Sequence, residues 1–261
     1  MKTIFSTMIV FLFFFDSSFA ETKLKIGTDE WPPYEYVTGL PGNECMSGFS
    51  TDVILLVLKK MNVIPNGRIE QFPWARGEKM VIDGSLDMLY TAATSEKRAK
   101  IVHYPSEPIV ESAWSLFIRS EDSGKLKYES LGDLKGKRIG VVRAYAYTPE
   151  FRSFIEAEQN YEEVAGDDQN VRKLMYRRID YIVMDYGNGL YLIDKMNLTG
   201  KIVPLKKPIA KISLYPIFSR NTVEKEFVDR FSDELKAFKA TPEYKKIYDR
   251  YFSVSGDIPG Q

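Results

Sequence analysis

Residues 84–108 read GSLDMLYTAATSEKRAKIVHYPSEP, and this stretch decides how we interpret the chain. It contains a short apolar strand, a turn rich in Thr and Ser, the arginine Arg98 and a second short apolar run. Small hydroxyl residues after a strand leave backbone N–H groups free, and a guanidinium beside them adds a planar fork that fits a carboxylate. The stretch therefore predicts a site for a small acid. The alternative for Arg98 is a solvated surface charge.

Upstream of this stretch, apolar periodicity and stop signals predict alternating strands and helices. Ser50 or Thr51 is expected to cap the first helix, and Gly84 to end the second. The expected elements are a strand at 23–28, a helix from 50 or 51 to about 61, a strand at 68–72, a helix at 74–82 and a strand at 87–89. This order is βαβ organisation.

Downstream, the same alternation resumes after a polar stretch at 119–124 that suits a crossing between lobes. Thr148 before Pro149 is a strong helix start, and Asp168 is expected to cap the next helix. The expected elements are strands at 113–118, 138–142, 179–184 and 212–218, and helices from 148, from 168 through 176, at 222–240 and at 243–252. Two crossings imply a hinge, so we expect lobe 1 at 22–118 plus 217–261 and lobe 2 at 119–216.

The first 22 residues, MKTIFSTMIVFLFFFDSSFAET, have the pattern of a secretory signal peptide. Lys2 precedes an apolar run from residue 4 to 15, which is shorter than the roughly 20 residues of a spanning helix. Small residues then lead to Ala20, after which we expect cleavage. The mature chain, 241 of 261 residues, is expected to be soluble and periplasmic.

Composition excludes several classes of function. Lys plus Arg and Asp plus Glu both number 36, so no net field favours nucleic acid or an anionic membrane. Cys45 is the only cysteine and His103 the only histidine, which excludes an internal disulfide and leaves little for a zinc site or a Ser/His/Asp triad. We interpret Cys45 as structural or incidental, and His103 as structural. There is no P-loop, and we expect no cofactor and no metal.

Other motifs lie in the order found in one known family. GFSTDVILLVLKKM at 48–61, GKRIGVV at 136–142 and LKAFKATPEYKKIYDRYF at 235–252, with the Arg98 stretch, resemble the family 3 extracellular solute-binding proteins, the periplasmic amino-acid receptors of ABC importers. The resemblance implies an α/β, two-lobed periplasmic-binding-protein fold of type II, with a two-stranded hinge and a ligand cleft between the lobes. The closed form of such proteins docks on a membrane permease.

The resemblance also assigns roles to single residues. Arg98 matches the arginine that pairs with the ligand α-carboxylate, and Asp185 matches the carboxylate that accepts the ligand amine. For Asp185 the alternative is a cap for the helix that follows it. Trp31 and Trp74 match aromatic residues that contact the ligand side chain, whereas Trp114, in an apolar strand, is expected in the core.

Two departures from the family pattern alter the expected site. Ala93 stands where a Ser or Thr usually helps to bind the carboxylate, and RAYAY at 143–147 replaces a Gly-Thr-Thr turn. Tyrosine rings in that turn would narrow the cleft, and extra cations make a ligand with more than one acidic group, or one that is not an α-amino acid, credible. The remaining predicted ligand-binding residues are Arg76, Tyr90, Thr91, Arg143, Tyr145 and Tyr147.

Three functions fit these residues. The first is a monomeric periplasmic protein that captures an amino-acid-like or carboxylate-bearing solute by hinge closure and delivers it to the permease of an ABC importer. The second is a cyclohexadienyl dehydratase-like enzyme on the same fold, for which Glu107 and Asp185 are weak candidates as acid or base. The third is a ligand-binding receptor for a sensor or chemotaxis system.

Overall fold

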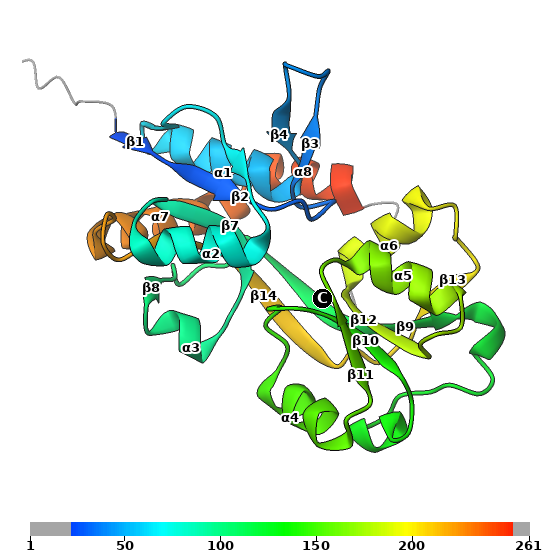
Figure 1. Ribbon diagram of the computed structural model, residues 1–261. Coiled ribbons are helices and arrows are strands. Elements are labelled where there is room, and N and C mark those ends of the chain that lie inside the picture. Colours follow the sequence, from blue (N-terminus) through cyan, green and yellow to red (C-terminus); the bar gives the residue numbers. More distant parts are fainter. Residues whose placement is uncertain (1–21, 253–261) are drawn as a thin grey trace, which may run out of the picture.

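The computed structural model describes residues 22–252, which form two α/β lobes connected by two long strands (Figure 1). The predicted signal peptide at 1–20 lies outside the described residues. Within residues 22–252, no helix has both the length and the apolar character needed to cross a bilayer. The mixed α/β class predicted from the sequence is confirmed.

The first lobe contains elements from both ends of the described chain. They are β1 (Thr22–Leu24), β2 (Ile26–Thr28), β3 (Tyr36–Thr38), β4 (Cys45–Ser47), α1 (Phe49–Lys60), β5 (Val63–Pro65), β6 (Glu70–Gln71), α2 (Trp74–Asp83), β7 (Met88–Ala93), α3 (Glu96–Ala99), β8 (Val102–His103), α7 (Lys225–Lys239) and α8 (Pro242–Phe252). His103 therefore lies in a strand, as expected.

The second lobe is built from the middle of the chain. It contains the 3₁₀ helices η1 (Ser120–Asp122) and η2 (Leu131–Leu134), then β10 (Ile139–Val142), α4 (Pro149–Glu158), β11 (Tyr161–Val164), α5 (Asp167–Met175), β12 (Tyr181–Asp185), α6 (Tyr186–Lys195) and β13 (Ile202–Pro204). The connecting strands are β9 (Val110–Arg119) and β14 (Ala210–Ser219).

One sheet continues through both lobes in the order β11-β10-β12-β9-β14-β7-β2-β6, with β13 on β9 and β8 on β14. The pairs on each side are parallel: β2 with β6 and β7 in the first lobe, and β10 with β11 and β12 in the second. Strands β9 and β14 pair antiparallel with each other in the middle. The chain thus crosses between the lobes twice. The expected boundaries at 118/119 and 216/217 fall within these two strands and stay a prediction.

The sequence analysis missed the hairpin of β3 and β4, which projects from the first lobe (Figure 1). Gly39 in its turn has a φ of +102°, a conformation that costs glycine little. After the hairpin, α1 begins at Phe49 with Gly48 as its N-cap, so the expected cap at Ser50 or Thr51 is wrong. The Thr51 hydroxyl instead donates to the backbone oxygen of Ser47 at 3.2 Å.

Helix starts in the second lobe were predicted with mixed success. The Thr148 hydroxyl accepts from the backbone N–H of Phe151 at 3.3 Å, and Pro149 is the first residue of α4, as predicted. In contrast, α5 begins at Asp167 with Gly166 as its N-cap, so the cap expected at Asp168 is wrong. This shift of one residue places the Asp167 side chain in the interior of the protein, where it is 5 % exposed.

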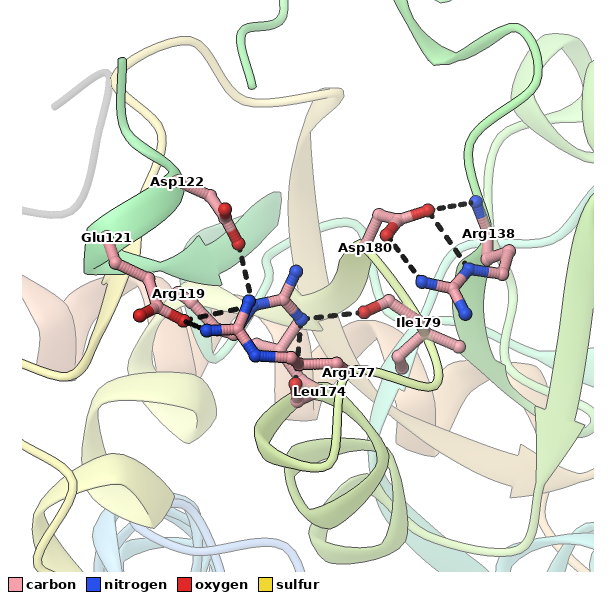
Figure 2. Close-up of polar contacts among 8 residues, drawn as sticks. All are labelled: Arg119, Glu121, Asp122, Arg138, Leu174, Arg177, Ile179 and Asp180. Atoms are coloured by element: carbon pink, nitrogen blue, oxygen red, sulfur yellow. Dashed lines mark hydrogen bonds and ion pairs between the residues drawn. The ribbon is translucent and has the colours of Figure 1, made fainter. Parts of the chain in front are cut away.

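The polar stretch at 119–124 does not form a separate crossing but turns back onto the second lobe. Arg119, at the end of β9, is 6 % exposed and donates through Nη1 to the backbone oxygens of Leu174 and Ile179 at 2.7 and 2.8 Å. Figure 2 shows the surrounding ion pairs, including Arg119 with Asp122 at 2.6 Å. Leu174 lies in the last turn of α5, and its carbonyl also accepts from the backbone N–H of Arg177 at 3.0 Å, so Arg119 connects β9 to the end of this helix.

Candidate functional site

A cleft of about 810 Å³ lies between the lobes, a size typical of sites for small ligands. The first lobe lines it with residues 29–32 and 71–75, and the second lobe with residues 143–145 and 165–168 and with side chains of α5 and α6. A smaller cavity of about 30 Å³ shares Asp29, Trp31, Trp74 and Tyr145 with this cleft and extends inward to Arg98. We call the two together the interlobe site.

Several lining segments follow the carboxyl ends of parallel strands. Asp29 follows β2, Arg143 follows β10, and residues 165–168 follow β11. Open α/β sheets bind ligands at such strand ends, because the loops there face a crevice that no strand covers. The topology therefore brings together loops that are more than 100 residues apart in the sequence.

Arg98 lies at the inner end of the site and is held by a network of side chains. It is 5 % exposed, and its Nε donates to Glu78 at 2.5 Å. Its Nη1 donates to the backbone oxygen of Ala93 at 2.9 Å and to the Tyr104 hydroxyl at 3.1 Å. The guanidinium carbon lies 5.3 Å from the centre of the Trp74 ring. These contacts fix the guanidinium and, among the described residues, give no hydrogen-bond partner to Nη2.

Aromatic rings from both lobes form the walls. The centre of the Trp31 ring lies 6.3 Å from that of Trp114 and 5.9 Å from that of Tyr145. Trp114 and Tyr145 also pack together at 5.9 Å, and the Trp114 indole N–H donates to the backbone oxygen of Ala146 at 3.1 Å. Trp114 is 2 % exposed, so it is a core residue as expected, but it also lines the inner cavity.

Three acids in or beside the interlobe site have raised pKa values. Burial raises the pKa of Asp29 to about 7, and the neighbouring Glu35 carboxyl opposes that rise. Burial, with the charge of Asp29, raises the pKa of Glu35 well above its ordinary value. The Thr91 hydroxyl donates to Glu35 at 2.6 Å. On the opposite lobe, burial raises the pKa of Asp167 to about 7, against contacts with Trp31 and Tyr145 that lower it.

Asp185, predicted to accept a ligand amine, is completely buried and does not line the interlobe site. Its Oδ1 accepts from the backbone N–H of Asn188 at 2.9 Å, so it caps α6, and from the Tyr34 hydroxyl at 2.8 Å. The Ser112 hydroxyl donates to the other oxygen. Burial raises the pKa of Asp185 to about 6, against these hydrogen bonds. The alternative role, a helix cap, is the one that the structure shows.

The other predicted site residues divide into two groups. Those that line the interlobe site, besides Arg98, are Trp31, Trp74, Thr91, Arg143 and Tyr145. Three lie outside the lining: the Arg76 guanidinium covers the Phe72 ring, the Tyr90 hydroxyl shares a hydrogen bond of 2.9 Å with Thr51, and the Tyr147 hydroxyl accepts from the Val142 N–H at 2.9 Å. Tyr147 nevertheless packs on Trp114 at 4.9 Å and so supports the wall.

Comparison with known proteins identifies the family. A sequence model of the bacterial extracellular solute-binding proteins, family 3, matches residues 24–254. The chain belongs to this family. The resemblance seen in the sequence is thereby confirmed, and no curated protein sequence matches the chain.

Solved structures show the same two-lobed fold. A histidine kinase sensor domain with similarity to periplasmic binding proteins has a TM-score of 0.74 and 22 % identity, covering 88 % of this chain and 96 % of its own. An ABC uptake transporter substrate-binding protein from Streptococcus pneumoniae, with bound histidine, has a TM-score of 0.74 and 15 % identity, covering 92 % and 95 %. The ancestral amino-acid-binding protein AncCDT-1, a precursor of cyclohexadienyl dehydratase, has a TM-score of 0.72 and 17 % identity, covering 88 % and 95 %.

Within this family fold, the sequence analysis missed several residues of the site or its immediate surroundings, among them Asp29, Glu35, Trp114 and Asp167. The available signal for Asp29 was its position directly after an apolar strand, and for Asp167 the expected helix start one residue later. Among residues 22–252, no group of three or more His, Cys, Asp or Glu side chains is arranged to hold a metal ion.

Proposed function

We propose that this solute-binding protein captures a small amino-acid-like or carboxylate-bearing solute by closing its lobes, and delivers it to the permease of an ABC importer. The observation that carries the proposal is Arg98, buried at the inner end of the interlobe site with its guanidinium fixed by Glu78 and one nitrogen left for a ligand. A carboxylate there would gain a charge-assisted hydrogen bond in a region largely closed to water.

Hinge closure is supported by the way the lobes are connected. Only β9 and β14 carry the chain between them, and a few residues in such strands can absorb a rotation of one lobe against the other. Trp31 of the first lobe already lies against Tyr145 of the second. Bound solute would stabilise this closed arrangement by contacting both lobes at once.

The protein is proposed to act as a monomer in the periplasm, after cleavage behind Ala20. Support comes from the pattern of the first 22 residues and from the extracellular family. Delivery to an importer rests on a likeness to an ABC uptake transporter protein, whereas the likeness to a sensor domain supports a signalling receptor as the second candidate. If the protein serves an importer, loss of the gene would reduce uptake of the solute. If it serves a sensor, loss of the gene would abolish the cell's response to the solute without reducing uptake.

A thermal-shift screen of the mature chain against the common amino acids and small di-acids tests solute binding. At a hundredfold excess over Kd, a ligand stabilises the folded protein by about 2.7 kcal/mol. For a chain of this size that raises Tm by roughly 5–11 °C. A shift with at least one of these compounds is expected. No shift with any of them, together with turnover of prephenate or arogenate, would favour the dehydratase-like enzyme instead.

A further inference from the structure

Two carboxyl groups face the interlobe site from opposite lobes. Asp29 follows β2 of the first lobe, and Asp167 begins α5 of the second. In each, the Oδ1 atom is buried and has no hydrogen-bond partner among residues 22–252. Asp167 is 5 % exposed and belongs to the cleft lining, so its unpartnered oxygen is a buried acceptor at the site. Buried acceptors of this kind are costly unless something binds to them.

Among the described residues, neither of these carboxyl groups forms an ion pair, although cations line the same cleft. Arg98, the cation of the inner cavity, is already paired with Glu78 at 2.5 Å. In the outer cleft, Arg143 and Lys195 are exposed, and Arg172 pairs with Asp168 at 3.3 Å. Burial is the largest influence on the pKa of both Asp29 and Asp167, and no cation is among the groups that offset it.

The rings that line the interlobe site with these carboxyl groups suit a positive charge as well. Trp31 lines both the cleft and the inner cavity, and the ring centres of Trp114 and Tyr145 lie within 6.3 Å of its own. The faces of indole and phenol rings attract cations, most strongly where water is excluded. Carboxylates combined with aromatic faces are the chemistry that holds an organic ammonium or guanidinium group, whereas a bare metal ion of the calcium type takes six to eight oxygen ligands.

We infer that the solute carries a cationic nitrogen group besides any α-ammonium, either an ammonium or a guanidinium, which Asp29 and Asp167 hold at the interlobe site beside the Trp31 indole. This inference rests on the proposed function and narrows its substrate class. Asp185 does not serve this role, because Tyr34, Ser112 and the start of α6 already use its oxygens. Asp167 is the carboxylate of the second lobe that meets the charge.

Isothermal titration of the mature protein at pH 8 tests the inference with matched pairs of probes. L-Arginine is compared with L-citrulline, and L-lysine with L-norleucine, because the second compound of each pair lacks the positive charge of the side chain. Putrescine tests the amine without a carboxylate. At least one cationic probe is expected to bind more than tenfold tighter than its neutral partner. Asp29→Asn and Asp167→Asn should each abolish most of that difference, whereas Asp229→Asn, on the exposed face of α7, should not.

Three outcomes would overturn the inference, and they separate it from the proposed function. Equal or tighter binding of L-citrulline or L-norleucine, or tightest binding of a neutral or acidic amino acid, would refute the cationic site while leaving a solute-binding protein. A charge preference that survives both Asp substitutions, in variants that unfold as cooperatively as the wild type, would remove these residues from the site. Binding of no amino acid, amine or di-acid at all would refute both proposals.

Discussion

Raising the pH from 5.5 to 8 should destabilise the protein when no ligand is bound, because of Asp29 and Asp167. Burial raises the pKa of each from 3.8 to about 7 in the folded chain. Between these values the folded protein keeps a proton that the unfolded chain has released. Protonation therefore stabilises the fold at low pH, and this stabilisation is lost as the pH rises through about 7.

The size of the effect follows from the pKa values. One pKa unit corresponds to about 1.4 kcal/mol, so a carboxyl with a pKa of about 7 loses roughly 2 kcal/mol of stability between pH 5.5 and 8. Asp29 and Asp167 together lose about 4 kcal/mol if they titrate independently. The raised pKa values of Glu35 and Asp185 act in the same direction and add to this loss. For a chain of this length the corresponding fall in Tm is on the order of 10 °C.

His103 acts in the opposite direction. Burial, with Arg220 and Lys225 nearby, lowers the pKa of His103 below 6.5. The unfolded chain therefore binds the proton more readily, and this group makes the fold more stable as the pH rises. The variant His103→Gln should therefore steepen the fall in Tm.

Differential scanning calorimetry of the ligand-free mature chain in matched buffers measures the effect. Asp29→Asn should make the fall in Tm smaller by roughly 5 °C, whereas Asp233→Asn, an exposed aspartate on α7, should leave the fall unchanged. A wild-type Tm that rises from pH 5.5 to 8 would contradict the burial of these carboxyl groups without a counter-charge. An unchanged slope in Asp29→Asn would show that Asp29 is not one of the groups responsible.

Two further results are expected. Replacing Trp31 with Phe should remove most of the fluorescence change that ligand binding causes, and a full change in that variant would place Trp31 away from the bound ligand. Thr148→Ala should lower the free energy of unfolding in urea by about 1 kcal/mol, because the Thr148 hydroxyl accepts from the backbone N–H of Phe151. Thr148→Ser keeps the hydroxyl and should not lower it. Equal effects of both substitutions would show that the cap contributes little.

The sequence predicted elements well where local signals agree with the fold. Thr148 and Pro149 begin α4, and Gly84, with a φ of +85°, ends α2. Local signals failed at α1, because Gly48 is set by a close approach to the Tyr34 backbone, where a Cβ would lie 2.4 Å from a carbonyl oxygen. Such an approach depends on the folded chain, so propensities near residue 48 do not reveal it.

The residues of the site were harder to predict from the sequence than the elements of the fold, because the partners of its charged groups are distant in the chain. Arg98 was found from its own turn, but Glu78, which fixes it, belongs to a different helix. Asp185 was assigned to a ligand amine by resemblance, whereas Tyr34 of the other lobe occupies it. Asp167 and Asp168 are adjacent acids, but only Asp167 is buried, because α5 begins at Asp167. The sequence alone does not show which of the two residues begins the helix.

The most direct test of solute binding in this cleft is a titration of Arg98→Lys with whichever compound stabilises the wild type most. Lysine keeps the charge but loses the planar fork, and a charge-assisted hydrogen bond contributes about 1.5–3 kcal/mol. We expect Kd to rise by roughly 10- to 150-fold, with a similar Tm in the absence of ligand. Arg220→Lys is the matched control, since Arg220 also bonds backbone oxygens near α3 but does not line the site. An unchanged Kd in Arg98→Lys would contradict the account, because the ligand would then bind without the guanidinium around which the site is built.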